Sequence, residues 1–151
     1  MTDPLVLGVK RKAGCEDVPL PAYKTAGASG LDICAACDAD VEVAPGAIVL
    51  VPTGLTMAVP PGYEAQIRAR SGLALRHGLV IVNAPGTIDS DYRGEVGIII
   101  GNIGRDPFTI ARGDRIAQMV IQPVTRVEVV VRGELDATAR GAGGFGHTGL
   151  Q

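Results

Sequence analysis

The segment between two apolar runs carries more reactive side chains than a simple turn requires. It reads Asn83-Ala84-Pro85-Gly86-Thr87-Ile88-Asp89-Ser90-Asp91-Tyr92-Arg93-Gly94. A hairpin connection needs only a few residues, and longer polar connections are often functional. The Asn83 amide with exposed backbone matches the donor and acceptor edge of a base, and Asp89 is a candidate to position and deprotonate a water. An acidic surface loop held by a salt bridge is the alternative that spacing alone leaves open.

A second group, Arg68-Ala69-Arg70-Ser71-Gly72, ends a strand pattern and precedes a short helix expected around Gly72–His77. An arginine and a serine beside the free N–H groups of a helix suit a phosphate. Taken alone this signal is weak, because Ser71 could simply be a helix N-cap.

The third group lies in the C-terminal tail, which reads Arg140-Gly141-Ala142-Gly143-Gly144-Phe145-Gly146-His147-Thr148-Gly149. Residues 141–146 match G-x-G-x-x-G, but a dinucleotide fold needs a strand before this motif, and a helix and an acidic residue after it. Only five residues follow the match, so that fold is excluded. Glycine N–H groups, the forked Arg140 and the flat ring of Phe145 favour binding of a phosphorylated ligand over a purely disordered tail.

Short strands must position these groups, because apolar and polar residues alternate along the chain with turn residues between the runs. In the clearest run, Tyr63, Ala65, Ile67 and Ala69 share one face. We expect strands at Val41–Val43, Ala47–Val51, Thr56–Val59, Tyr63–Arg70, Leu79–Asn83, Val96–Ile100, Phe108–Ile110, Arg115–Ile121 and Val127–Val131. About nine strands at this spacing predict a sandwich, jelly roll or distorted barrel. The intervening turns are Ala44-Pro45-Gly46, Pro60-Pro61-Gly62, Ala84-Pro85-Gly86 and Arg112-Gly113-Asp114.

The composition agrees with a single all-β domain. Of 151 residues, 21 are Gly and 10 are Pro, which argues against a helical bundle. Hydrophobic residues make up 46% and charged residues 20%, which argues against disorder. The segment from Gly133 to Gln151 holds six Gly and no strand-forming run. We therefore expect a β domain over residues 1–132 and a flexible Gly-rich C-terminal arm over residues 133–151.

Charge and cysteine content narrow the partners. A formal net charge of −2 gives no broad attraction to nucleic acid or to an anionic membrane, and no apolar run approaches a membrane span. The basic residues Lys10 to Lys12 follow the apolar segment Leu5 to Val9, the wrong order for a signal peptide, so we expect a cytoplasmic protein. Cys34 and Cys37 form a C-x-x-C that we interpret as chance spacing of small, partly buried residues.

With two further segments, the three groups resemble the five motifs of the trimeric deoxyuridine triphosphatase (dUTPase) family. The five segments are Ala26-Gly27-Ala28-Ser29-Gly30-Leu31-Asp32, Arg70-Ser71-Gly72-Leu73-Ala74, Gly86 to Gly94, Gly113-Asp114-Arg115-Ile116-Ala117-Gln118, and Arg140 to Gly149. Each is weak alone, but their shared order and spacing over nearly the whole chain are highly specific. The resemblance implies a jelly-roll-like or distorted β-barrel (β-clip) fold with one short helix, assembled as a homotrimer whose active sites are shared between subunits.

The resemblance also implies hydrolysis of dUTP to dUMP and pyrophosphate, with Mg²⁺ held on the triphosphate. This reaction limits uracil in DNA and supplies dUMP for thymidylate synthesis. Asp89 would activate the water that attacks the α-phosphorus, and Tyr92 would pack under the sugar and exclude a ribose 2′-hydroxyl. Four positions would hold uracil: Asn83, Thr87, Ile88 and the backbone of Gly97.

The remaining roles that the resemblance implies concern the phosphates. A neighbouring subunit would contribute Arg70, Ser71 and Gly72. Gln118 would lie near the α-phosphate, and Asp32 would act on the metal indirectly, through water. From the tail, Phe145 would cover the base, and the distal phosphates would be held by Arg140, His147 and Thr148; position 147 is Ser or Thr in many relatives.

Two functions other than dUTP hydrolysis are possible for such a sequence. A dCTP deaminase of the same superfamily uses a Glu near C4 of the base, whereas the hairpin here has Asp89 and Tyr92, and Glu95 lies beyond the turn. A non-catalytic nucleotide-sensing trimer would use the same pocket, but an intact Asp89 with a complete tail argues against it.

Overall fold

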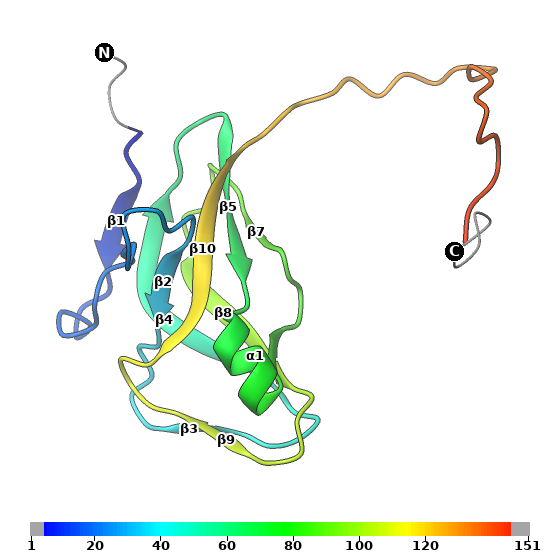
Figure 1. Cartoon of the computed structure of the whole chain (residues 1–151). Coiled ribbons are helices and arrows are strands. Elements are labelled where there is room, and N and C mark those ends of the chain that lie inside the picture. Colours follow the sequence, from blue (N-terminus) through cyan, green and yellow to red (C-terminus); the bar gives the residue numbers. More distant parts are fainter. Residues whose placement is uncertain (1–4, 146–151) are drawn as a thin grey trace.

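The computed structural model describes residues 5–145, and within them the fold is all β apart from one short helix (Figure 1). The strands are β1 (Gly8–Arg11), β2 (Leu31–Cys34), β3 (Val41–Val43), β4 (Ile48–Ala58), β5 (Tyr63–Arg68), β6 (Leu79–Ile81), β7 (Gly86–Ile88), β8 (Glu95–Asn102), β9 (Phe108–Ile110) and β10 (Arg115–Pro123). The helix α1 (Ser71–His77) joins β5 to β6. No helix in this part of the chain is long and apolar enough to cross a bilayer.

Two four-stranded sheets enclose the core. One has the strand order β1-β4-β8-β6, the other has the order β2-β10-β5-β7, and β3 pairs with β9 in a separate two-stranded sheet. Every pairing is antiparallel. Side chains of both large sheets meet in a single apolar cluster, to which β8 contributes Ile98 and Ile100 while the opposite sheet contributes Ile67 and Met119. The expected all-β, jelly-roll-like fold is confirmed, although the strands do not close into a barrel.

The alternation seen in the sequence decides which side chains face this core. Along β5, Ala65 and Ile67 are buried while Arg68 is exposed. Along β8, Val96, Ile98 and Ile100 point inward and Gly97 points outward. Because side chains of a strand alternate between its two faces, the residues that would touch a ligand are placed opposite those that hold the fold.

The strands expected at residues 47–51 and 56–59 are one continuous strand, β4. Pro52 and Gly54 interrupt the apolar run and predicted a break, which was wrong. The pairing of β4 with β8 instead shifts between Pro52 and Thr56. Proline is tolerated within a sheet at such a bulge, because the ladder hydrogen bond that it cannot donate is already missing there.

The strand expected at residues 127–131 was also wrong. Val129 and Val131 are 89% and 97% exposed, and the segment has no strand assignment. Valine favours strands because it packs against neighbours, and this segment has no neighbouring strand in the chain to pair with. The reverse error concerns β1, β2 and β7, which have short or weakly alternating sequences and were not predicted.

Asn102 at the end of β8 is a buried polar residue that joins three segments. Its Nδ2 donates hydrogen bonds of 2.8 Å to the carbonyl oxygens of Val43 and Asp106, and its Oδ1 accepts one of 2.8 Å from the Gly104 N–H. All polar atoms of the side chain are therefore engaged, as a buried amide requires.

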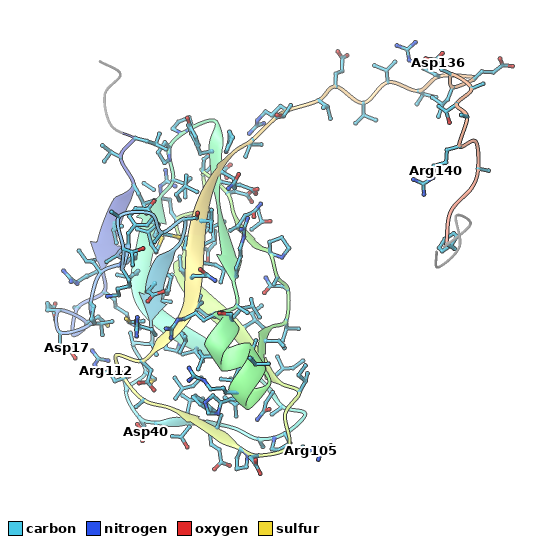
Figure 2. The ribbon with its side chains drawn as sticks, in the orientation of Figure 1. Asp17, Asp40, Arg105, Arg112, Asp136 and Arg140 are labelled. Atoms are coloured by element: carbon cyan, nitrogen blue, oxygen red, sulfur yellow. The ribbon has the colours of Figure 1, made fainter. Side chains whose placement is uncertain are left out.

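Arg112 connects three loops at the edge of the sandwich, where Figure 2 shows it beside Asp17. Its Nε and Nη2 donate to the two carboxylate oxygens of Asp17 at 2.8 and 2.7 Å, and Nη2 also donates to the Gly14 carbonyl at 2.6 Å. Its Nη1 donates to the carbonyls of Ala36 and Cys37 at 3.2 and 3.3 Å. The hydrogen bonds from Arg112 lower the pKa of Asp17 from 3.8 to about 2.

The three cysteines are free and buried. Cys37 packs in the main core, whereas Cys34 belongs to a smaller cluster with Cys15, and burial raises the pKa of the Cys34 thiol. The two residues of the C-x-x-C therefore pack in different clusters, and their interpretation as chance spacing stays a prediction.

Candidate functional site

A cavity of about 170 Å³ opens between β7, β8 and the loop that joins them. It contains all six residues of the predicted base, sugar and water sites: Asn83, Thr87, Ile88, Asp89, Tyr92 and Gly97. The apolar wall comes from core-facing strand residues such as Ile67, Ile81 and Ile98. Ligand pockets for drug-sized molecules measure roughly 300–1,000 Å³, so this cavity suits one ring of a ligand.

Two glycines allow backbone to line this cavity. Gly86 pairs with Ile67 of β5 and is buried, and a Cβ at this position would lie 3.1 Å from the Asn83 Nδ2. A Cβ on Gly97 would lie 2.7 Å from Cδ1 of Leu50. A larger residue at either position would therefore displace the groups beside it.

The loop after β7 is held by its own hydrogen bonds. The Tyr92 N–H donates to the Asp89 carbonyl at 3.2 Å, and the Tyr92 hydroxyl donates to the Glu95 carbonyl at 3.0 Å. Arg93 Nη1 donates to the carbonyls of Ser90 and Tyr92, both at 2.8 Å. The Asp89 side chain is exposed, and none of the ion pairs within residues 5–145 involves it. The alternative of a salt-bridged surface loop is therefore not supported for Asp89.

A second cavity, of about 320 Å³, lies where β2 and β10 meet. It is lined by charged and polar side chains with small residues between them: Lys24, Ala28, Ser29, Gly30, Asp32, Arg68, Arg115, Gln118 and Val120. The two cavities share no lining residue. One chain therefore presents two separate parts of the predicted site.

Asp32 lines the second cavity and lies between two arginines. Its Oδ2 accepts a 2.8 Å hydrogen bond from Arg115, and its Oδ1 lies 3.8 Å from Nε of Arg70. Arg70 Nη1 also donates to the Arg115 carbonyl at 2.6 Å. Gln118 lies opposite Asp32 in the sheet register, and its Nε2 donates to the Ala69 carbonyl at 2.9 Å. The structure thus brings Asp32, Arg70 and Gln118 together.

Ser71 and Gly72 begin helix α1, one residue earlier than expected. The N-cap is Arg70, with extended backbone and no side-chain cap hydrogen bond, so the alternative of Ser71 as N-cap is wrong. Ser71 is the first helical residue and its side chain is exposed. The Arg70 backbone caps the helix while its guanidinium group faces Asp32, which leaves Ser71 free of a capping role.

The tail residues do not reach either cavity in this chain. Figure 2 shows Arg140 on an arm that leads away from the sandwich, and its Nε donates only to a near neighbour, the Gly143 carbonyl, at 2.8 Å. Phe145 is fully exposed, with a φ of 51°. The predicted site residues His147 and Thr148 lie outside the described residues.

Two contacts of this region were not predicted from the sequence. Arg115 pairs with Asp32, and Glu95 accepts a 3.0 Å hydrogen bond from the Gly54 N–H through Oε1. No local pattern shows these contacts, because each joins strands that are far apart along the chain. The Glu95 carboxylate is engaged with Gly54, which does not favour the acid/base role that a deaminase would need.

No cluster of three or more His, Cys, Asp or Glu side chains that could hold a metal occurs in the described part of the chain. A carboxylate has about four acceptor sites, so Asp32 retains capacity for a water beside its two arginines. Mg²⁺ commonly keeps several waters and binds through one or two carboxylates and substrate phosphates. Asp32 therefore fits an indirect metal contact better than a direct protein cage.

Comparisons with known proteins agree on one family. A family model described as dUTPase matches residues 16–149. A protein of Methylocella silvestris named deoxyuridine 5′-triphosphate nucleotidohydrolase is 57% identical over 151 residues, covering 99% of this chain and 94% of that protein. A protein of the same name from Desulfotalea psychrophila is 60% identical over 135 residues, covering 89% of this chain and 90% of that protein.

Solved structures show the same fold. A mutant dUTPase of Staphylococcus bacteriophage 80alpha with dUpNHpp superposes with a TM-score of 0.84 at 25% identity, covering 96% of this chain and 99% of that one. A dUTPase of phage phi11 of S. aureus, described with a structural Mg(II) ion, superposes with a TM-score of 0.76 at 24% identity. The latter covers 85% of this chain and 97% of that one.

Proposed function

The chain belongs to the dUTPase family, and on that premise we propose that it hydrolyses dUTP to dUMP and pyrophosphate by attack of water on the α-phosphorus. The residue assignments rest on the cavity beside β7. This ring-sized space is bordered by the exposed carboxylate of Asp89 and by Tyr92. A nucleotide whose base fills this cavity has its sugar and phosphates directed out past these two side chains.

Asp89 is the proposed general base. Its exposed carboxylate can accept a proton from a water, and it belongs to a loop held by a backbone hydrogen bond and by the Arg93 side chain. A positioned general base contributes about a hundred- to ten-thousandfold to a rate. The proton of the attacking water passes to Asp89 as the new bond to phosphorus forms and the bond to pyrophosphate breaks.

The hairpin selects the base and the sugar in this proposal. The Asn83 amide and the backbone around Thr87, Ile88 and Gly97 supply donors and acceptors to the edge of uracil, and we assign exclusion of the thymine methyl group to the same residues, all of which line the cavity. Tyr92 packs under the deoxyribose and excludes a 2′-hydroxyl.

The phosphates are bound by groups from more than one subunit. We assign Arg70, Ser71 and Gly72 of a neighbouring subunit to the phosphates, and Gln118 to the α-phosphate. Charge that builds on the phosphate oxygens in the transition state is stabilised by such preorganised donors. The separation of the two cavities within one chain supports a site completed by a second chain.

The C-terminal arm completes the site in the same proposal. Arg140, His147 and Thr148 hold the distal phosphates, and Phe145 covers the base. In one chain Arg140 and Phe145 line neither cavity, and the hydrogen bonds of Arg140 and Gly141 stay inside the arm. We therefore propose that residues 133–151 close over the site of another subunit, in a homotrimer whose β domain ends at residue 132.

Mg²⁺ is the proposed metal, bound to the triphosphate with Asp32 in contact through water. When bound, it neutralises phosphate charge and favours departure of pyrophosphate. Asp32 holds Arg70 and Arg115 in place, and its remaining acceptor capacity orients the surrounding waters. We also propose a cytoplasmic location, which agrees with three free thiols.

Incubation with dUTP, dCTP or dTTP in the presence of Mg²⁺ tests this function. We expect pyrophosphate from dUTP alone. Ammonia from dCTP would instead identify a deaminase, and tight binding of dUTP without turnover would identify a sensor.

Shared sites are tested by mixing subunits. Asp89→Asn and Arg70→Ala chains, each inactive alone, are unfolded, mixed and refolded together. We expect partial recovery of activity, because some mixed sites then contain both intact residues, and a particle of about three times the 15.5 kDa chain by light scattering. Absence of recovery in a correctly sized particle contradicts shared sites.

A further inference from the structure

Glu95, the first residue of β8, makes three contacts that the proposed reaction leaves unexplained. Its Oε1 accepts a 3.0 Å hydrogen bond from the Gly54 N–H, and its Oε2 lies 3.6 Å from the Lys12 ammonium. Its main-chain carbonyl accepts the 3.0 Å hydrogen bond from the Tyr92 hydroxyl. The same residue thus touches a distant strand through its side chain and the sugar-facing tyrosine through its backbone.

The partner of the carboxylate is a structurally defined point, the bulge of β4. Gly54 has a φ of 65°, and a Cβ there would lie 2.6 Å from the Cys15 Sγ. The Gly54 carbonyl accepts a 2.8 Å hydrogen bond from the Lys12 N–H, and the neighbouring Thr53 hydroxyl donates to the Val96 carbonyl at 2.6 Å. The Gly54 N–H is therefore a fixed donor, and the Glu95 carboxylate satisfies it.

Tyr92 is held mainly at its hydroxyl. Its side chain is 44% exposed, so packing restrains the ring only in part. A Cβ on Gly94 would collide with the Tyr92 hydroxyl, which shows how closely the ring lies against the turn. The place of the ring consequently depends on the place of the Glu95 carbonyl that accepts its hydrogen bond.

We propose that Glu95 is a positioning residue that selects deoxyribose over ribose by fixing Tyr92. The hydrogen bond from the Gly54 N–H in the β4 bulge to the Glu95 carboxylate fixes the position of the first residue of β8. The main-chain carbonyl of Glu95 is thereby fixed, and it positions the Tyr92 ring by accepting the hydrogen bond from the hydroxyl. This inference rests on the proposed role of Tyr92 at the sugar. Glu95 borders the same cavity, but in this scheme its carboxylate binds the Gly54 N–H and contacts neither the reacting atoms nor the phosphates.

The two side-chain contacts of Glu95 are separable. The Lys12 side chain is 67% exposed, and exposed ion pairs contribute little. The hydrogen bond to Gly54 needs only an acceptor oxygen, which the amide of glutamine also provides. We therefore expect the acceptor function of residue 95, and not its charge, to matter.

The test measures the ratio of kcat/KM for dUTP to kcat/KM for UTP. Wild-type protein is compared with Glu95→Ala, Glu95→Gln, Lys12→Met and the benchmark Tyr92→Phe. We expect Tyr92→Phe and Glu95→Ala each to lower the ratio by about fivefold, the size of one hydrogen bond. In Glu95→Ala, kcat for dUTP changes less than twofold. Glu95→Gln and Lys12→Met keep the wild-type ratio.

A double variant separates positioning from a general loss of structure. If Glu95 acts through Tyr92, Glu95→Ala adds nothing to the ratio change of Tyr92→Phe, whereas independent effects would multiply. Should Glu95→Ala fail to fold, Glu95→Asp takes its place, because its carboxylate is one methylene short of the Gly54 N–H while its charge remains.

The outcomes distinguish this proposal from the function on which it rests. A wild-type protein that does not hydrolyse dUTP overturns the proposed function itself. A normal wild-type enzyme in which Tyr92→Phe lowers the ratio, but Glu95→Ala and Glu95→Asp do not, overturns the role of Glu95 alone. A ratio unchanged in Tyr92→Phe removes the tyrosine from sugar selection and overturns the proposal as well.

Discussion

The sandwich and the C-terminal arm use the same kinds of residue in opposite ways. In the sandwich, Ile98 and Ile100 are each 1% exposed, whereas Leu135 of the arm is 85% exposed and Phe145 is fully exposed. The hydrogen bonds of Arg140 and Gly141 stay within the arm. Figure 1 shows the arm leading away from the sheets. The sandwich thus has a core that fixes its backbone, and the arm in one chain has none.

Because of this difference, the residues that stabilise the fold and some of the residues proposed to act on the substrate lie in different regions. The cavity beside β7 is built on strands that the core already orders, so it is formed before a ligand arrives. A segment without a core must be ordered when it binds, and the free energy of ordering is drawn from its contacts with the ligand or with another subunit. Changes in the arm should therefore affect turnover, and changes in the core should affect folding.

The largest expected effect comes from a residue on the sandwich that contributes to no core. Asp89→Asn should lower kcat by about a hundred- to ten-thousandfold, because the amide cannot act as a general base. Isothermal titration with a non-hydrolysable dUTP analogue should show nearly unchanged binding, and thermal unfolding should match the parent. Near-normal turnover would exclude Asp89 from this role.

Removal of residues 141–151 tests the arm directly. Loss of the glycine-rich segment should lower turnover by about a hundredfold or more, the size expected when a transition-state donor is lost. The sandwich should still fold, with a thermal midpoint within about 2 °C of the parent. A truncated chain that no longer folds would show that this part of the arm is needed for folding and does not serve turnover alone.

A matched pair of truncations measures the contrast in stability. Ile100→Ala removes a side chain from the centre of the core and should lower the free energy of unfolding by about 2–5 kcal/mol. Leu135→Ala removes one from the arm and should change it by less than about 0.5 kcal/mol. Denaturant unfolding at fixed chain concentration gives both values, and equal losses would show that the arm packs as a core element in the assembly.

The smallest effect concerns the Arg112 clamp at the rim of the sandwich. The pKa of Asp17 is lowered from 3.8 to about 2, so its contribution to stability is present above pH 3.8 and is lost as the pH falls through about 2. Because the pair is exposed, salt should weaken the contribution further. In low salt, the gap in thermal midpoint between the parent and Asp17→Asn should close over this range. A difference in thermal midpoint that stays constant would show that the effect of Asp17→Asn comes from the shape of the side chain and not from its charge.

The sequence predicted the fold wherever local pattern and final packing agree. Alternation along β5 placed Ala65 and Ile67 on the buried face, and the turn glycines Gly46, Gly62 and Gly113 all have positive φ. Pattern failed at the β4 bulge and at residues 127–131. In both cases the outcome depends on a partner strand, which propensity alone does not specify.

For the site, the sequence predicted which residues line the cavity beside β7, but not the contacts that hold these residues in place. Asp89 and Tyr92 are close in sequence, so their proximity follows from a single loop. The pairs Arg115 with Asp32 and Glu95 with Gly54 join separate strands, and their spacing along the chain carries no signal. Long-range side-chain pairing therefore had to come from the structure.

The buried amide of Asn102 has a consequence for mutational scanning. A leucine of similar size would leave two carbonyls and one N–H without partners inside the protein, and an aspartate would place a negative charge against the same two carbonyls. A survey of tolerated substitutions would accordingly score position 102 as severely as position 89. Protein abundance in cells tells the two apart, since inactive Asp89 variants should accumulate normally, whereas Asn102 variants should be degraded.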